Sequence, residues 1–196
     1  MPENFDNNYD SKKHLLPVAA IFSVIISMIL LLRMQGRIWW CKTGDLAPFT
    51  FDAWSTHTSQ HLFDPYSFTH ILHGVMFFWL VSLLFRRSGL VWRFIAAVAI
   101  EAVWEVAENT NAVIEHYRQN TASLDYFGDS IFNSLGDVIA CAAGFYIAYK
   151  LGWKRSLVFF LATEIVLLVW IRDSLLLNIL MLIYPLDSIK NWQIGG

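Results

Sequence analysis

The sequence carries few charged residues for its length. Only 15% of its 196 residues are Asp, Glu, Lys or Arg, whereas 56% are hydrophobic. A soluble domain usually carries about 25% charged residues, so lipid or other protein must cover the excess apolar surface. The formal net charge of −2 provides no positive field that would attract nucleic acid, and we expect no such partner.

Cysteine is scarce, and no internal repeat is visible. Two cysteines cannot build a disulfide framework. Cys41 follows a Trp pair in a polar stretch and Cys141 lies in an apolar run, so we expect no bond between them. The lack of a repeat argues against an inverted-repeat transporter. Trp is abundant instead, with nine residues, and this side chain prefers membrane interfaces.

Long apolar runs predict an all-α fold, a polytopic transmembrane helix bundle of about five spans. The first run, Leu15–Leu32, has no charge and nearly spans a hydrocarbon core of about 30 Å. A signal peptide is the alternative, but Arg33 and Met34 follow in place of a small-residue cleavage site. We predict a disordered cytoplasmic tail over 1–14 and a single membrane domain over 15–196, with helices over 15–33, 65–85, 90–107, 130–149 and 156–172.

The stretches between these helices have their own signals. Asp64 and Pro65 suit a helix start, and Asp129 or Ser130 can cap the fourth helix. Residues 34–63 resemble an interfacial segment and 108–128 a polar loop. The apolar segment 174–185 is too short to span alone. It either extends the fifth helix or lies at the interface as a sixth element.

Basic residues gather in two predicted turns. Arg86, Arg87 and Arg93 follow the second helix, and a second group separates the fourth helix from the fifth. Cytoplasmic loops are enriched in Lys and Arg. We therefore expect these turns and the N-terminus to face the cytoplasm. The second group comprises Lys150, Lys154 and Arg155.

This topology places ionisable residues in the outer halves of four helices. Glu101, Glu105 and Glu108 are spaced i, i+4, i+7, and His70 and His73 are spaced i, i+3, so each set shares one helix face. A charge at the bilayer centre costs at least about 2.5–3.5 kcal/mol, so such groups are paired or line a wet cavity. The full candidate cluster comprises His70, His73, Glu101, Glu105, Glu108, Asp129, Asn133, Asp137, Arg172 and Asp173.

Three interpretations of this cluster stay open, and with them whether the chain is an enzyme. It could bind a lipid or envelope-precursor head group, with Arg172 and Arg118 holding phosphate and the acidic groups holding a cation or sugar hydroxyls. It could only lock the bundle together, with Arg172 neutralising a glutamate. It could also be a metal-dependent hydrolase or transferase, although no HExxH spacing occurs. A divalent metal would then take ligands from His70, His73, Glu101, Glu105 and Asp129.

Other features have simpler interpretations. His57 and His61 have an i, i+4 spacing that can bind zinc, but we interpret them as the polar face of an interfacial segment. Glu164 lies in the middle of the fifth helix and needs a partner across the bundle. A stripe of small residues on the fourth helix predicts close approach of another helix. The stripe is Gly136, Ala140, Gly144 and Ala148.

Several longer motifs stand out: Met34–Arg37, Ser59–Gly74, Trp104–Asn109, Tyr126–Ser130, Asn133–Asp137, Ile171–Asp173 and Trp192–Gln193. They resemble those of a family of small bacterial membrane proteins, uncharacterised protein family 0314, also called domain of unknown function 2585. The likeness covers nearly the whole chain from about residue 34. It implies a multi-pass protein of the inner (plasma) membrane, of alpha-proteobacterial type, and no activity.

A shorter pattern, Asp129-x-x-x-Asn133-x-x-Gly136 after a carboxylate-bearing helix, is similar to VanZ-like membrane proteins, some of which are linked to glycopeptide resistance. That likeness implies only envelope-related work at the outer face. The expected partners are therefore the lipid bilayer and an envelope lipid or precursor. The identity of a metal and the oligomeric state do not follow from the sequence.

Overall fold

The computed structural model describes residues 6–122 and 126–195, with residues 6–14 described by their backbone alone. This part of the chain forms helices and no strand, so the all-α prediction is confirmed. The helices are α1 (Asp6–Met34), α2 (Ser67–Leu84), α3 (Leu90–Glu108), α4 (Asn111–Asn120), α5 (Ile131–Ile171), α6 (Leu175–Ile183) and α7 (Asp187–Gly195).

Two expected non-helical stretches contain helix. α1 begins at Asp6, so residues 6–14 are helical where a disordered tail was expected, and residues 1–5 lie outside the described part. The expected polar loop over 108–128 contains α4, and α7 follows the last apolar segment. α4 and α7 are rich in polar residues, so no apolar run in the sequence indicates them.

α5 is two helices joined at a sharp bend. Gly152 has φ 71° and ψ 173° inside it, a backbone conformation that glycine adopts without the steric cost of a Cβ atom. The bend lies within the predicted 150–155 turn, so the two limbs of α5 correspond to the fourth and fifth predicted helices. α6 then turns away from α5 by 74°. It therefore does not extend the fifth predicted helix.

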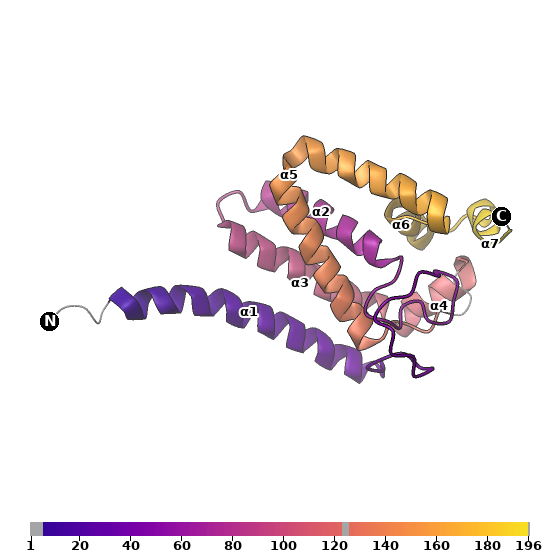
Figure 1. Cartoon of the computed structure of the whole chain (residues 1–196), viewed down its shortest axis with the longest axis horizontal. Coiled ribbons are helices and arrows are strands. Elements are labelled where there is room, and N and C mark those ends of the chain that lie inside the picture. Colours follow the sequence, from indigo (N-terminus) through magenta and orange to yellow (C-terminus); the bar gives the residue numbers. More distant parts are fainter. Residues whose placement is uncertain (1–5, 123–125, 196) are drawn as a thin grey trace.

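α2 lies at the centre of the bundle (Figure 1), between α3 and the two limbs of α5. Its residues Leu72 and Val75 pack with Phe160 and Leu167 of the second limb. α1 lies on the outer side of α3 and contributes residues of its C-terminal half to the core. The side chains of Leu15, Leu16 and Val18, nearer its N-terminus, are exposed and therefore need lipid or another protein to cover them.

The small-residue stripe of α5 makes the expected close contact, and its partner is α2. A Cβ atom placed on Gly144 would lie 1.9 Å from the carbonyl oxygen of Ile71, and one on Gly74 would lie 1.9 Å from that of Cys141. Backbone therefore touches backbone along this seam. The register of α2 against α5 follows from these contacts, because larger residues do not fit.

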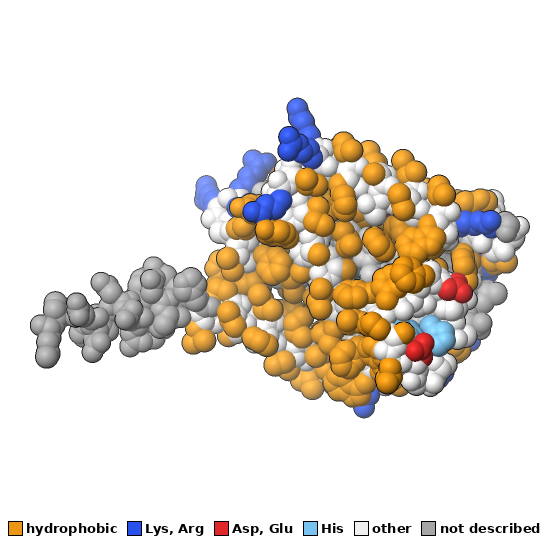
Figure 2. All heavy atoms as spheres, viewed as in Figure 1, with side chains coloured by type: hydrophobic (Ala, Val, Ile, Leu, Met, Phe, Trp, Pro, Cys, Tyr) orange, Lys and Arg blue, Asp and Glu red, His pale blue; other side chains and the backbone are white. Residues whose placement is uncertain are grey.

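Within the described residues, two helices are long and apolar enough to cross a membrane by length and composition, Leu15–Met34 and Ser67–Leu84. The bent pair α5 and α6 adds a third if it counts as one span. This is fewer than the five expected spans. Figure 2 shows hydrophobic side chains over most of one face, with Lys and Arg gathered near the α2–α3 turn and the bend of α5.

The opposite end of the bundle holds the polar segments. Residues 35–66 and α4 lie there beside the end of α3 and the start of α5 (Figure 1). Asp64 accepts hydrogen bonds from the backbone N–H groups of Tyr66 and Ser67 before α2, and the Ser130 side chain accepts one from the N–H of Asn133. Ser130 is therefore the N-cap of α5, as expected. α2 begins at Ser67, two residues later than expected, with Tyr66 as its N-cap, so Asp64 holds the turn ahead of this helix and is not its cap residue.

Candidate functional site

The centre of the site is a histidine–glutamate cluster between α2 and α3. His70 Nδ1 lies 2.5 Å from Glu101 Oε1, and His73 Nδ1 lies 3.0 Å from Glu101 Oε2. Glu105, one turn further along α3, places Oε1 3.4 Å from His70 Nδ1. All four side chains are buried. The i, i+3 and i, i+4 spacings thus bring two imidazoles against two carboxylates.

Negative charge exceeds positive charge in this cluster. Asp137, from the first limb of α5, places Oδ2 3.8 Å from His70 Nε2 and accepts a hydrogen bond of 2.9 Å from Ser67 Oγ. At most two imidazolium charges therefore face three buried carboxylates. Neither oxygen of Glu105 has a hydrogen-bond partner among the described residues. A proton or a cation is needed to make such an arrangement stable.

The expected arginine lock is not formed. Among the described side chains, every ion pair with a carboxylate involves a histidine. Arg172 ends α5 in a left-handed conformation with φ 54°, and its carbonyl accepts a hydrogen bond from Gln193. The interpretation in which Arg172 neutralises a glutamate therefore has no ion pair to support it among the described residues. That position turns the chain between α5 and α6 and does not direct the guanidinium into the cluster.

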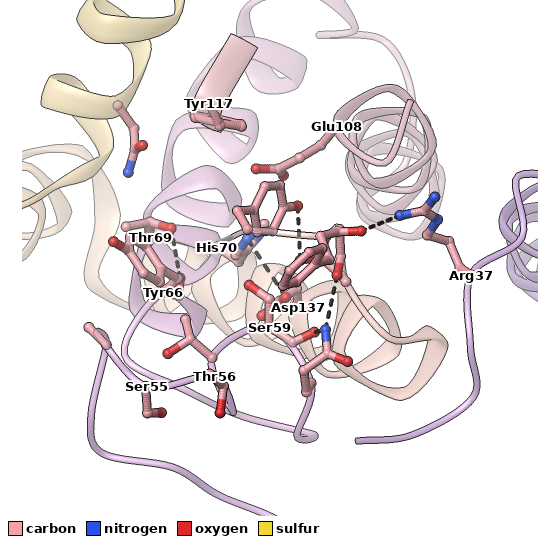
Figure 3. Close-up of a pocket in the computed structure, with 18 of the residues that line it drawn as sticks. Arg37, Ser55, Thr56, Ser59, Tyr66, Thr69, His70, Glu108, Tyr117 and Asp137 are labelled. Carbon is pink, nitrogen blue, oxygen red and sulfur yellow. Dashed lines mark hydrogen bonds and ion pairs between the residues drawn. The ribbon is translucent and has the colours of Figure 1, made fainter. Parts of the chain in front are cut away.

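A cavity of about 710 Å³ opens beside the cluster. Its lining combines polar side chains of the bundle with a wall from α6, as the close-up in Figure 3 shows for His70, Glu108, Tyr117 and Asp137. The α6 wall is apolar except for Asn178 and consists otherwise of Leu175, Ile179 and Leu182. The cavity can therefore contact both a polar and an apolar part of one ligand.

Asp129 forms a second polar node in the cavity lining. Its carboxylate accepts hydrogen bonds from Asn109 Nδ2 at 2.7 Å and from the Tyr126 hydroxyl at 3.0 Å, while its N–H donates to Asn109 Oδ1. Burial raises the pKa of Asp129 from its ordinary value, and these hydrogen bonds oppose the shift. Burial also raises the pKa of Asp64, and the backbone hydrogen bonds that its carboxylate accepts oppose the shift. One of these bonds comes from the N–H of Ser59, so Asp64 holds the turn of residues 59–67 together.

Two triplets of side chains in this region have donor atoms close enough together to share a metal ion. They are His70, His73 and Glu101, and His70, Glu105 and Glu108. Asp129, also expected as a ligand, belongs to neither triplet and is held instead by Asn109 and Tyr126.

A family model described as a protein of unknown function, DUF2585, matches residues 32–195 of this chain. The chain belongs to the DUF2585 family. The family resemblance drawn from its motifs is therefore confirmed.

Curated relatives of the DUF2585 chain carry the family name UPF0314. The UPF0314 protein of Brucella anthropi is 46% identical over 184 residues, which cover 92% of this chain and 90% of the relative. That of Rhizobium meliloti is 42% identical, covering 90% and 89%, and that of Paracoccus denitrificans is 38% identical, covering 90% and 92%. No solved structure matches. The VanZ-like resemblance receives no support from these comparisons.

The DUF2585 structure places the remaining predicted residues around the cluster. Glu108 lines the cavity at the end of α3. Asn133 donates to the backbone carbonyl of His61 and so holds residues 35–66 onto α5. Asp173 accepts hydrogen bonds of 3.3 Å from the hydroxyl of Tyr66 and from Asn178. Arg172 does not line the cavity.

Several lining residues of this DUF2585 chain were missed from the sequence. Arg37 and Lys42 line the cavity from the segment after α1, and Tyr117 lines it from α4. Of these three residues, Arg37 alone lies in one of the family motifs, and that motif was the signal that could have pointed to it. Tyr117 lay in a stretch expected to be a loop, so no helix face could be assigned to it.

Proposed function

We propose that this DUF2585 protein is a multi-pass inner-membrane protein in which α1, α2, α3 and both limbs of α5 cross the bilayer. Each limb of α5 is roughly 30 Å long at 1.5 Å per residue. The bend at Gly152 returns the chain to the end of the bundle that holds the cavity. Exposed Arg86, Arg87 and Lys150 at the other end support a cytoplasmic location for that end and for the N-terminus.

In this proposal the cavity binds the polar head group of an envelope lipid or lipid-linked precursor. The observation that carries the proposal is the combination of a polar floor and an apolar α6 wall in one cavity of about 710 Å³. Carboxylates of the floor accept hydrogen bonds from sugar hydroxyls or an amine. Leu175, Ile179 and Leu182 contact the first part of an acyl or prenyl chain.

Phosphate recognition falls to the cavity rim rather than to Arg172. Arg37 and Lys42 line the cavity, and the Lys42 ammonium lies 4.4 Å from the ring centre of Phe127. The Arg118 guanidinium lies 5.4 Å from the same centre. Two cations thus flank the exposed ring of Phe127, and Arg37 donates a hydrogen bond to the backbone carbonyl of the same residue. A phosphate can meet these cations without burial of uncompensated charge.

The test is native mass spectrometry of the detergent-purified protein with two probes, a polyprenyl phosphate and phosphatidylglycerol. Leu182→Trp fills the cavity, whereas Ile183→Trp changes the next residue, which is 76% exposed. We expect wild type and Ile183→Trp to retain bound lipid and Leu182→Trp to lose at least about ten-fold in affinity, equivalent to 1.4 kcal/mol. Equal binding by all three, or none by wild type, would overturn the proposal.

A second candidate function is metal-dependent hydrolysis or group transfer at the same cavity. It is favoured by the position of Glu105 next to the triplet His70, His73 and Glu101. The buried carboxylate of Glu105 has no hydrogen-bond partner among the described residues. The two imidazoles and Glu101 could hold a divalent metal, and Glu105 could then serve as a base toward water.

Metal content separates the two candidates. We expect the Glu101→Gln/Glu105→Gln variant to contain one metal ion fewer per chain than wild type, measured by elemental mass spectrometry on folded protein. An unchanged metal content with unchanged lipid binding would remove the metal-dependent candidate and leave head-group binding in place.

A further inference from the structure

A second group of metal-ligating side chains lies outside the histidine–glutamate cluster, in the segment between α1 and α2. Cys41 and Asp45 come from its first turn, and His57 and His61 come from the turns that precede α2. Four side chains from two parts of the segment therefore converge. None of them belongs to the two metal-ligating triplets at the cavity.

The donor atoms of this group lie close together. Cys41 Sγ is 3.4 Å from His57 Nδ1, which is 3.1 Å from His61 Nε2. Asp45 Oδ2 is 3.8 Å from both imidazole nitrogens. In a tetrahedral zinc site, bonds of 2.3 Å to sulfur and about 2.0–2.1 Å to nitrogen place neighbouring donors about 3.3–3.6 Å apart. The thiol and the two imidazoles thus already lie at nearly the spacing that zinc requires.

Hydrogen bonds alone cannot pair all of the donor atoms that meet here. His57 Nδ1 has a thiol, an imidazole nitrogen and a carboxylate oxygen around it, yet a ring nitrogen carries at most one proton. A cation at the centre would satisfy all of these lone pairs at once. Sulfur, two imidazole nitrogens and one carboxylate oxygen are the donor types that zinc prefers.

The surroundings orient these donors. The other ring nitrogen of His61 hydrogen-bonds the carbonyl of Ala47, which directs the lone pair of Nε2 toward the group. The His61 side chain is only 1% exposed, and Trp40 packs edge-on against its ring. Thr43 Oγ1 contacts Cys41 Sγ at 3.2 Å. Tight anchoring of a metal ligand through its second ring nitrogen is typical of protein zinc sites.

The outer side of the group is open to solvent. The side chains of His57 and Asp45 are 32% and 46% exposed, whereas Cys41 and His61 are buried. A metal ion can therefore enter from the exposed side and meet the buried ligands. With four protein ligands the coordination is complete, which is characteristic of structural rather than catalytic zinc.

We propose that Cys41, Asp45, His57 and His61 form a structural zinc site that closes the segment between α1 and α2. The same segment supplies part of the cavity lining, including Lys42, Thr56 and Ser59. Zinc at this site would fasten the outer wall of the cavity. It would also hold Cys41 as a metal-bound thiolate. The proposal does not depend on what the cavity binds.

Cobalt substitution tests the site in the full-length protein in detergent, because Co²⁺ bound by a thiolate shows a ligand-to-metal charge-transfer band and intense tetrahedral visible bands. We expect wild type to bind one Co²⁺ with both signatures and zinc to displace it. Cys41→Ser should abolish the charge-transfer band, and His57→Ala should weaken zinc binding by more than about 100-fold, since loss of a second-shell partner alone costs 10–100-fold.

Two control variants separate this site from the rest of the protein. Cys141→Ser removes the other cysteine, which lies in α5, and Glu101→Gln/Glu105→Gln removes the carboxylates of the cavity cluster. Both should keep the thiolate–cobalt band. A wild-type spectrum without that band, or its retention in Cys41→Ser, would overturn the proposal whatever the lipid-binding result.

Discussion

Substitution of Gly144 tests whether the α2–α5 seam positions the candidate site. A Cβ atom at this position would lie 1.9 Å from the carbonyl oxygen of Ile71, and real Cβ contacts essentially never fall below 3.0 Å. Gly144→Val therefore requires α2 and α5 to separate by at least about 1 Å. The contact is with backbone, so a change of side-chain rotamer cannot relieve it.

The cost can be estimated from overpacking in well-packed cores, where extra methylene groups destabilise by about 1–3 kcal/mol. For a chain of this size, 1 kcal/mol lowers Tm by about 2–4 °C. We therefore expect Gly144→Val to lower Tm by roughly 2–12 °C. His70 and His73 flank the contact on α2, so the shift should also separate their rings from Glu101.

Thermal unfolding in detergent measures this effect, with Ala143→Val as the matched control. Ala143 is the preceding residue of the same helix but is exposed, so valine there introduces the same β-branched side chain without the clash. Helix propensity by itself would favour Gly144→Val over Ala143→Val, so it cannot produce the expected order of Tm values. Equal Tm values for the two variants would refute the seam as the element that sets the position of α2. If the Gly144→Val variant is destabilised but binds metal or lipid as wild type does, the α2–α5 seam does not position the candidate site.

Two further predictions concern the α5–α6 junction. Glu164 accepts hydrogen bonds from the N–H groups of Leu175 and Leu176 at 3.0 and 3.3 Å, so it supplies an acceptor to the start of α6. Glu164→Ala should cost about 1 kcal/mol in a thermal unfolding assay, and Glu164→Gln less; equal stability of both variants with wild type would contradict this role. Arg172 has φ 54° and no ion pair with a described carboxylate. Arg172→Gly should therefore raise Tm slightly, because glycine avoids the cost of roughly 1–2 kcal/mol that other residues meet in a left-handed conformation, although it adds entropy to the unfolded chain. A fall in Tm would instead show that the Arg172 side chain stabilises the fold.

Much of the helical framework could be predicted from apolar runs and the residues that end them. The predicted basic turn at 150–155 contains the Gly152 bend, and Ser130 caps α5 as expected. The small-residue stripe predicted a close helix contact without naming α2 as its partner. α4 and α7 were missed because they have only 10 and 9 residues and a polar composition, so their few apolar positions are too short a pattern to establish a helical period.

The candidate site was predictable where one helix supplies several residues. The spacing of His70 and His73, and of Glu101 and Glu105, placed each pair on one face, and the structure turns these faces toward each other. Contacts between distant segments were not predictable. His57 and His61 were interpreted as an interfacial polar face because nothing in the sequence shows that the chain folds back to bring Cys41 beside them.

The N-terminus of α5 offers no anion-binding site to a ligand in the deep part of the cavity. A helix N-terminus with free N–H groups attracts anions, but here the N–H groups of Ile131 and Phe132 donate to the carbonyls of Ile38 and Trp39, and that of Asn133 donates to Ser130. No backbone donor of this first turn is left for a ligand.

Carboxylates therefore dominate the electrostatics of the cavity floor, with Asp137, Glu108 and Asp129 in the lining and Glu101 and Glu105 behind it. A phosphate placed there would meet uncompensated negative charge, which is costly in a buried site. The deep part of a ligand should therefore carry hydroxyl groups, an amine or a metal ion. Any phosphate should stay at the rim beside Arg37 and Lys42, so the head group of a phospholipid, or the sugar of a glycosylated polyprenyl phosphate, would lie deeper in the cavity than the phosphate that carries it.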